Sequence, residues 1–216
     1  MGLPSLRFER PAAPLTGIYA IVDPAFAPNP AALLDDVLAA GVRIVQYRAK
    51  AGVDGGLLRR LLARTRAAGA ALVVNDDVES ALAADGLHAG QEDLAGVDLA
   101  SLRARLGDRL FGVSCGTAAE ARAAEAAGAD YVGTGPFAAT SSKADAGVLL
   151  GPAGLAAVVA ATRLPVAAIG GIDLAALPAV ARAGAAMAAV ISAIALAPDP
   201  RAAARALVER WETVRT

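Results

Sequence analysis

The sequence of 216 residues contains only one cysteine and one histidine. Because Cys115 has no second cysteine to pair with, an internal disulfide is excluded, and so is a zinc site built from four cysteines. The single histidine likewise excludes a metal centre with several imidazole ligands. A membrane-spanning helix needs about 18 consecutive apolar residues. The most apolar stretch, residues 185–197, is shorter and is interrupted by Ser192, which argues against a transmembrane protein.

The sequence also lacks an excess of charge of either sign, since 20 Lys+Arg and 21 Asp+Glu give a net charge of −1. We therefore expect no nucleic-acid partner and no anionic membrane partner. With 56% hydrophobic and 19% charged residues, intrinsic disorder is excluded. Residues 1–15 contain three prolines but no continuous apolar core, so we expect an irregular N-terminal arm there rather than a signal peptide. Residues 16–216 are expected to form one cytoplasmic domain, for which a monomer and a homodimer both remain open.

Short runs of β-forming apolar residues alternate with alanine-rich amphipathic stretches along the chain. The predicted strands are Gly17–Val22, Val42–Tyr47, Ala71–Val74, Gly86–His88, Leu110–Ser114, Asp130–Gly133, Val166–Ile169 and Met187–Ile191. The predicted helices are Pro30–Ala40, Asp54–Ala68, Val78–Ala84, Asp98–Leu106, Thr117–Ala127, Pro152–Thr162, Leu174–Ala183 and Pro200–Thr213. Eight β-then-α units are typical of an α/β fold of the (β/α)8 TIM-barrel type.

The alternative fold is an open, doubly wound sheet, which also alternates strands and helices. That fold is expected to carry a G-x-G-x-x-G turn after its first strand, and here the position reads Val22-Asp23-Pro24. The barrel is therefore favoured. One connection, from Thr134 to Gly151, is long for a compact barrel, and loops of this length commonly close over a ligand.

Three polar residues alternate at the end of the second predicted strand. Because side chains alternate between the two faces of a strand, Gln46, Arg48 and Lys50 share one face, while Tyr47 and Ala49 lie on the other. Two cations at a barrel mouth are costly to desolvate unless an anion meets them. The pattern predicts an anionic ligand, most simply a phosphate, with solvated strand-end charges as the alternative.

Acidic residues follow the third and fourth predicted strands. Asp77 is expected to cap the next helix, which leaves Asp76 to be explained, and Asp93 lies just beyond a glycine turn. Carboxylates at the ends of neighbouring parallel strands can converge on one cation. Oxygen ligands without a Cys or His cluster suit Mg²⁺ shared with substrate phosphates. His88 could be catalytic, but a lone histidine within a strand favours a structural role, with a packed and hydrogen-bonded ring.

The later strand ends contribute hydroxyl groups and glycines. Ser114 is a candidate ligand hydroxyl, whereas Cys115 is expected to be a small buried residue. The loops after strands seven and eight, Ile169-Gly170-Gly171-Ile172 and Val190-Ile191-Ser192, match the position where TIM barrels often bind phosphate through backbone N–H groups. Tight turns selected for packing alone are the alternative for these glycines.

Taken in order, these segments resemble the thiamine phosphate synthase family over most of the chain, from Ile18 to Ile194. The matching stretches are Gln46-x-Arg48-x-Lys50, Val74-Asn75-Asp76-Asp77, Gly86-Leu-His-x-Gly-Gln-x-Asp93, Gly112-Val-Ser114, Gly128-Ala-Asp-Tyr-Val-Gly-x-Gly-Pro136, Thr140-x-Ser142-Lys143 and Ile169-Gly-Gly-Ile172. The resemblance implies a TIM barrel that joins 4-amino-2-methyl-5-hydroxymethylpyrimidine diphosphate to a thiazole phosphate and releases pyrophosphate.

The resemblance also implies a role for each matching residue. The pyrimidine diphosphate would contact Gln46, Arg48, Lys50, Asn75, Ser114 and Lys143, and the catalytic residues among these would be Arg48, Lys50, Ser114 and Lys143. The thiazole phosphate would contact Thr140, Ser141, Ser142, Gly171, Ile191 and Ser192. Asp76 and Asp93 would bind Mg²⁺.

Some residues depart from the family pattern. The segment Gly135-Pro-Phe-Ala-Ala-Thr-Ser-Ser-Lys143 shifts an aromatic residue and lacks a proline, and Cys115-Gly116 replaces the usual Thr-His. Two alternative functions therefore stay open beside the synthase. One is a thiazole tautomerase, a related isomerase that needs no diphosphate or metal, and the other is a non-catalytic barrel that binds a phosphorylated ligand.

Overall fold

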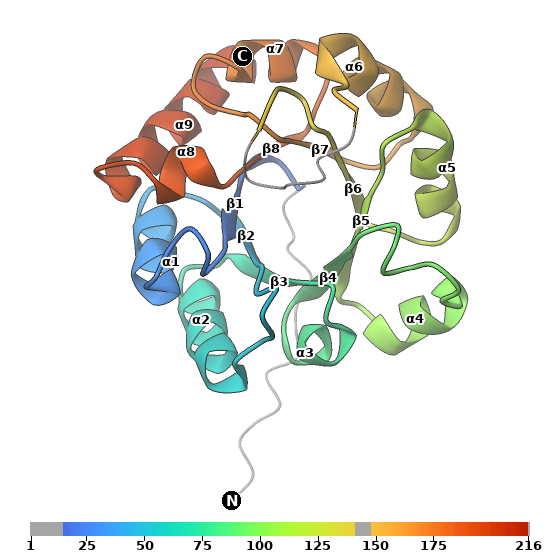
Figure 1. Cartoon of the computed structure of the whole chain (residues 1–216), viewed down its shortest axis with the longest axis horizontal. Coiled ribbons are helices and arrows are strands. Elements are labelled where there is room, and N and C mark those ends of the chain that lie inside the picture. Colours follow the sequence, from blue (N-terminus) through green and yellow to red (C-terminus); the bar gives the residue numbers. More distant parts are fainter. Residues whose placement is uncertain (1–14, 141–147, 216) are drawn as a thin grey trace, which may run out of the picture.

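The computed structural model describes residues 15–140 and 148–215. Eight parallel strands are hydrogen-bonded in sequence order, and β1 also pairs with β8, which closes the sheet into a barrel (Figure 1). The strands are β1 (Gly17–Val22), β2 (Ile44–Tyr47), β3 (Ala71–Asn75), β4 (Gly86–Ala89), β5 (Leu110–Ser114), β6 (Tyr131–Thr134), β7 (Val166–Ile169) and β8 (Met187–Val190). The predicted (β/α)8 TIM barrel is confirmed.

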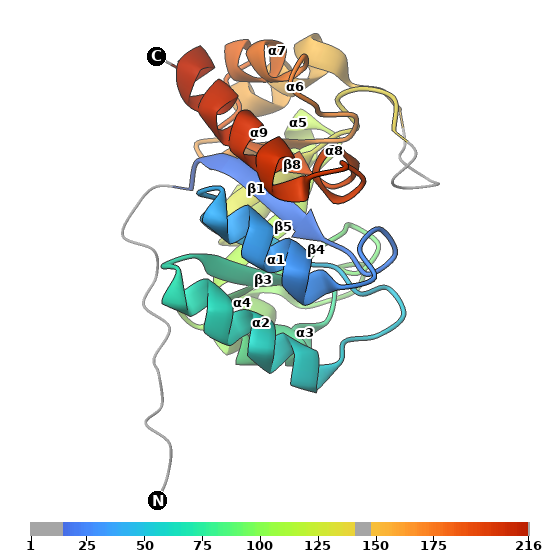
Figure 2. The same cartoon turned by 90° about the vertical axis from the view of Figure 1, so that its left-hand side faces the viewer.

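Helices form a ring around the barrel, as Figure 1 shows in the view along its axis and Figure 2 from the side. The helices are α1 (Pro30–Ala39), α2 (Gly55–Ala67), α3 (Val78–Ala83), α4 (Leu99–Leu106), α5 (Ala118–Ala126), α6 (Gly151–Ala161), α7 (Leu177–Arg182), α8 (Ser192–Ala195) and α9 (Pro200–Arg215). Within the described ranges, none of them is both long and apolar enough to cross a membrane.

Several element boundaries differ from the sequence prediction; β2, for example, begins at Ile44 instead of Val42, and β8 ends at Val190 instead of Ile191. Strand β6 begins at Tyr131 instead of Asp130, whose carboxylate accepts hydrogen bonds from the Phe111 N–H group and from Arg103. Helix α7 begins at Leu177, since the Asp173 side chain holds residues 173–176 in a turn. The short helix α8 was not predicted. The expected N-terminal arm lies outside the described residues apart from Leu15.

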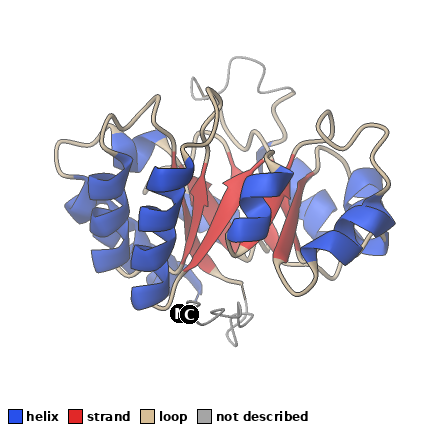
Figure 3. Cartoon of the chain, turned by 90° about the horizontal axis from the view of Figure 1, so that it is seen from below, coloured by secondary structure: helices blue, strands red, loops and turns tan. Residues whose placement is uncertain are grey.

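Two apolar layers stabilise the barrel, and alternation along the strands separates them. Outward-facing strand side chains, such as Leu72, and helix side chains that face the barrel, such as Leu34, form the layer between the strands and the helices. Side chains facing inward, among them Leu110 and Met187, fill the barrel interior, so it is a packed core rather than a channel. All strands run toward one rim, where their carboxyl ends meet the loops that lead into the helices (Figure 3). In TIM barrels this rim carries the functional site.

Candidate active site

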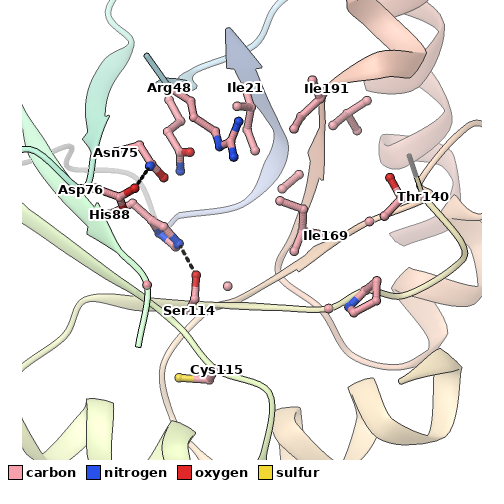
Figure 4. A pocket seen from close by; sticks show the side chains of 18 of the residues that line it. Ile21, Arg48, Asn75, Asp76, His88, Ser114, Cys115, Thr140, Ile169 and Ile191 are labelled. Carbon is pink, nitrogen blue, oxygen red and sulfur yellow. Dashed lines mark hydrogen bonds between the residues drawn. The ribbon is translucent and has the colours of Figure 1, made fainter. Parts of the chain in front are cut away.

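A cavity of about 460 Å³ opens at the carboxyl-terminal rim of the barrel, and every strand end or following loop contributes to its lining. Figure 4 shows how its side chains converge from opposite sides of the rim. The described residues that the sequence assigned to ligand or metal binding all line this cavity: Gln46, Arg48, Lys50, Asn75, Asp76, Asp93, Ser114, Thr140, Gly171, Ile191 and Ser192. Ser141, Ser142 and Lys143 lie outside the described residues.

Arg48 extends from the end of β2 and forms an ion pair with Asp23 at the end of β1, with Nη1 and Oδ2 2.5 Å apart. The Asp23 side chain is only 3% exposed, and its other carboxylate oxygen accepts the Ala25 N–H group. The pattern at the end of β2 predicts that a ligand supplies the anion for Arg48. That premise is wrong, because the protein supplies a carboxylate of its own. Arg48 nevertheless lines the cavity, where its remaining N–H donors can reach a ligand.

Lys50 also has a partner within the chain, because its Nζ donates to Oδ2 of Asp76 at 2.5 Å. The same oxygen accepts a hydrogen bond from the Asn75 amide, so one carboxylate ties the ends of β2 and β3 together (Figure 4). Asp76 has a φ angle of +61°, a left-handed conformation that non-glycine residues seldom adopt. Its N–H group donates to the carbonyl oxygen of His88, which holds this backbone in place. Such strained positions concentrate at functional sites.

Asp76 and Asp93 lie close enough for their carboxyl groups to share a hydrogen bond. Burial raises the pKa of Asp93, and the hydrogen bond with Asp76 and the negative charge of Asp76 raise it further. Burial opposes ionisation of Asp76 too, but hydrogen bonds from Lys50 and Asp93 lower its pKa overall. Two carboxyl groups this close favour a shared proton or a shared cation.

The donor chemistry of this pair fits Mg²⁺. Mg²⁺ is commonly held by one or two carboxylates, with water and substrate phosphate oxygens completing its coordination. Among the described residues no group of three or more His, Cys, Asp and Glu side chains could hold a metal by itself. The pair would therefore bind Mg²⁺ together with a phosphorylated ligand rather than as a closed protein site. Asp77 is separate from it and caps α3, as predicted, by accepting the Ser80 N–H group.

His88 is a buried residue within β4, and both of its ring nitrogens have partners. Nδ1 lies 3.1 Å from the Tyr131 hydroxyl, and Nε2 lies 3.0 Å from the Ser114 hydroxyl (Figure 4). Burial lowers the pKa of His88 to about 4, so the ring is neutral at physiological pH. This agrees with the predicted packed and hydrogen-bonded histidine. Cys115 is buried as expected, and burial raises its pKa to about 12, which leaves no reactive thiolate.

Gly170 and Gly171 follow β7 with φ angles of +94° and +62°. A Cβ atom at Gly171 would approach the carbonyl oxygen of Ala139 to 2.6 Å, and one at Gly170 would approach Cα of Pro136 to 2.8 Å. These glycines are therefore required where the β6–α6 loop crosses the β7–α7 loop. Packing already accounts for these glycines, so they do not by themselves indicate phosphate binding, which stays a prediction. The phosphate hypothesis now depends on the position of Gly171 and Ser192 in the cavity lining.

The short helix α8 begins at Ser192, on the same side of the cavity as Gly171. No side chain of the described residues caps its first turn. A short extra helix after strand eight, with its N-terminus toward the mouth, is the usual phosphate-binding feature of TIM barrels.

Sequence reasoning missed four residues that organise the site. Asp23 pairs with Arg48, Gln91 donates to the backbone carbonyl of Ser114, and Tyr19 and Tyr131 form hydrogen bonds inside the barrel. The alternation that placed Gln46 on the inner face of β2 applies equally to Tyr19 on β1 and Tyr131 on β6. The alternation of side chains along the strands could therefore have placed both tyrosines inside the barrel. Tyrosines within apolar strands, however, are typical of an ordinary core and do not indicate a site.

The fold and the site together define a (β/α)8-barrel enzyme whose polar residues, among them two neighbouring carboxyl groups, gather at the carboxyl-terminal rim. The model of the thiamine monophosphate synthase family matches residues 18–194. The chain belongs to this family.

Individual relatives agree with the family match. The thiamine-phosphate synthase of Geobacillus kaustophilus is 45% identical over 209 residues, covering 92% of this chain and 93% of its own. The bifunctional thiamine biosynthesis protein ThiM/ThiE of Symbiobacterium thermophilum is 46% identical over 96% of this chain, which spans 43% of that longer protein. The structure of thiamine phosphate pyrophosphorylase from Pyrococcus furiosus is 31% identical and superposes with a TM-score of 0.83, covering 93% of this chain and 98% of its own.

Proposed function

We propose that this chain condenses 4-amino-2-methyl-5-hydroxymethylpyrimidine diphosphate with 4-methyl-5-(2-phosphooxyethyl)thiazole to form thiamine phosphate and pyrophosphate. The observation that carries the proposal is the sharing of one cavity by two cations, two carboxyl groups and a glycine-rich loop beside a short helix. A diphosphate and a second phosphorylated molecule need these groups within reach of each other. Membership of the family supports the same reaction.

The proposed reaction is a dissociative transfer. The bond between the pyrimidine methylene carbon and the diphosphate oxygen breaks, and its electron pair leaves with pyrophosphate. The thiazole nitrogen then donates its lone pair to the methylene cation, which forms the new carbon–nitrogen bond. The difficult step is the build-up of negative charge on the leaving group, so groups that stabilise charge at this point provide most of the catalysis.

Side chains that follow β2, β3 and β4 supply most of that stabilisation. Arg48 and Lys50 would donate to oxygens of the departing diphosphate, and Lys143, from the segment outside the described residues, would add a third cation. Asp76 and Asp93 would hold Mg²⁺, which when bound would neutralise charge on the diphosphate oxygens. Gln46, Asn75 and Ser114 would orient the pyrimidine substrate by hydrogen bonds. Such fixed polar groups act strongly because they need little reorganisation as charge develops.

The opposite side of the cavity would hold the thiazole phosphate. Gly171, Ile191 and Ser192 line that side, as does Thr140 on the β6–α6 loop. Ser141 and Ser142 would join them from beyond the described residues. A loop over the mouth would also limit the access of water, which competes with the thiazole for the methylene cation.

We further propose that the chain acts in the cytoplasm on small phosphorylated molecules, without a nucleic-acid or membrane partner. Residues 16–216 would act as one domain, and a homodimer remains compatible with the site because all of the groups named above come from one chain.

An assay of pyrophosphate release tests the proposed reaction. With both substrates and Mg²⁺ present, we expect pyrophosphate and thiamine phosphate in equal amounts. Omission of the thiazole phosphate or chelation of Mg²⁺ should remove thiamine phosphate formation. If the thiazole phosphate binds but neither product appears, the synthase proposal fails. In that case a change in the thiazole spectrum would indicate an isomerase, and binding alone would indicate a non-catalytic protein.

A further inference from the structure

A continuous chain of hydrogen bonds crosses the barrel interior beneath the cavity. Gln46 Nε2 donates to the Tyr19 hydroxyl at 2.9 Å, and the Tyr19 and Tyr131 hydroxyl oxygens lie 2.7 Å apart. The Tyr131 hydroxyl is hydrogen-bonded to Nδ1 of His88 at 3.1 Å, and Nε2 of His88 is hydrogen-bonded to the Ser114 hydroxyl at 3.0 Å. Both ends of this chain, Gln46 and Ser114, line the cavity. The buried rings therefore connect two residues that the proposed reaction places on the same substrate.

Two glycines make room for these rings. A Cβ atom at Gly112 would lie 2.1 Å from Cζ of Tyr131, and a Cβ atom at Gly133 would lie 3.0 Å from Cε1 of His88. The centroid of the Tyr131 ring lies 5.5 Å from that of the His88 ring and 5.8 Å from that of the Tyr19 ring, which it meets edge-on. The neighbouring strands carry glycine where the rings lie, which leaves space for the rings. Packing therefore fixes the positions of Tyr131 and His88.

The distances alone leave open which groups donate between Tyr19, Tyr131, His88 and Ser114, but the first hydrogen bond favours one direction. The Gln46 amide nitrogen has no acceptor lone pair, so it donates to Tyr19, and the Tyr19 hydrogen is left to point at Tyr131. In this direction Tyr131 accepts from Tyr19 and donates its own hydrogen to Nδ1 of His88. A neutral imidazole that accepts at Nδ1 carries its hydrogen on Nε2, so His88 donates to Ser114. The Ser114 hydroxyl, which accepts from below, can then direct its own hydrogen into the cavity.

We propose that Tyr19, Tyr131 and His88 are positioning residues, which fix the Ser114 hydroxyl as a hydrogen-bond donor toward the diphosphate substrate. The inference rests on the proposed function for the identity of that substrate, whereas the direction of the hydrogen-bond chain belongs to the free protein. Burial raises the pKa of both tyrosines, so each keeps the hydrogen that the chain requires at neutral pH. A donor at this position suits an anionic oxygen, which can only accept.

The state of the imidazole provides the first test, because His88 is the sole histidine in the chain. In a histidine-labelled sample of the free protein at neutral pH, long-range ¹H–¹⁵N NMR distinguishes the protonated ring nitrogen from the unprotonated one. We expect one species with the proton on Nε2 and a bare Nδ1. A proton on Nδ1, or on both nitrogens, would overturn the proposal. The measurement needs no substrate, so its failure differs from failure of the proposed function.

A double-mutant cycle tests whether Tyr131 acts through Ser114. Tyr131→Phe should lower kcat/KM about tenfold, the typical effect of one hydrogen bond. In a Ser114→Ala background the same substitution should lower kcat/KM less than twofold, because the group that it positions is absent. Equal effects in both backgrounds would show that Tyr131 acts by another route and would contradict the proposal.

The matched control is Tyr47→Phe. Tyr47 is also a buried tyrosine, but it lies on the outer face of β2, and no hydrogen bond of this interior chain includes it. We expect Tyr47→Phe to leave the His88 NMR signals and kcat/KM unchanged, whereas Tyr131→Phe should alter both. If both variants alter the His88 signals equally, the effect is a general disturbance of the core and the positioning role is rejected.

Discussion

Replacement of Asp93 by alanine should reduce turnover about 10²–10³-fold and leave the affinity for thiazole phosphate nearly unchanged. Asp93 shares a hydrogen bond with Asp76 beside the proposed diphosphate position. Without the Asp93 carboxyl group, Asp76 would hold Mg²⁺ alone. Gly171 and Ser192, which would hold the thiazole phosphate, come from β7 and β8 rather than from β3 and β4. Steady-state pyrophosphate release and a separate titration with thiazole phosphate measure the two effects.

Asp108→Ala is the matched control for that substitution. It removes the same charge from an exposed turn before β5, at the opposite rim of the barrel. We expect turnover and thiazole phosphate affinity close to those of the unmodified protein. If Asp93→Ala lowers turnover and thiazole phosphate affinity by the same factor, the two substrates do not have the separate positions proposed here.

Replacement of Arg48 by methionine should lower the free energy of unfolding by about 3–5 kcal/mol, because it leaves the buried Asp23 carboxylate without its partner. It should also reduce turnover by about 10² or more, since a donor to the diphosphate is lost. Denaturant unfolding and pyrophosphate release measure the two losses separately.

The double variant Arg48→Met/Asp23→Asn separates the two roles of Arg48. An asparagine at position 23 carries no charge and keeps an oxygen that can accept from the Ala25 N–H group. Most of the stability should therefore return, while turnover should stay as low as in Arg48→Met. Recovery of turnover together with stability would mean that Arg48 acts only through the fold.

The fold could be predicted because each of its determinants is local. Apolar runs alternate with amphipathic stretches, and capping residues such as Asp77 and Asp199 mark the helix starts. The position of the site followed from the same regularity, since parallel strands direct their ends to one rim. Gln46, Asp76 and Ser114 could accordingly be assigned to that rim from their positions at strand ends.

The partners of these residues could not be predicted in the same way. The strand pattern predicts Arg48 as a cation in need of a ligand, but Asp23, 25 positions earlier in the chain, already neutralises it. That pairing depends on the register between β1 and β2, which the pattern of either strand alone does not determine. The double glycine after β7 predicts a phosphate loop, but the sequence does not reveal that its lack of side chains also permits the crossing of two loops. Long-range contacts of this kind emerge only from the assembled barrel.

The most direct measurement is a crystal structure of the protein with Mg²⁺, pyrophosphate and the thiazole phosphate. The proposed function predicts an ion bound to both Asp76 and Asp93, and pyrophosphate oxygens against Arg48 and Lys50. It also predicts the thiazole phosphate group against Gly171 and Ser192 in the same cavity. A pyrophosphate bound away from this rim, or an ion that leaves either aspartate without contact, would contradict the account.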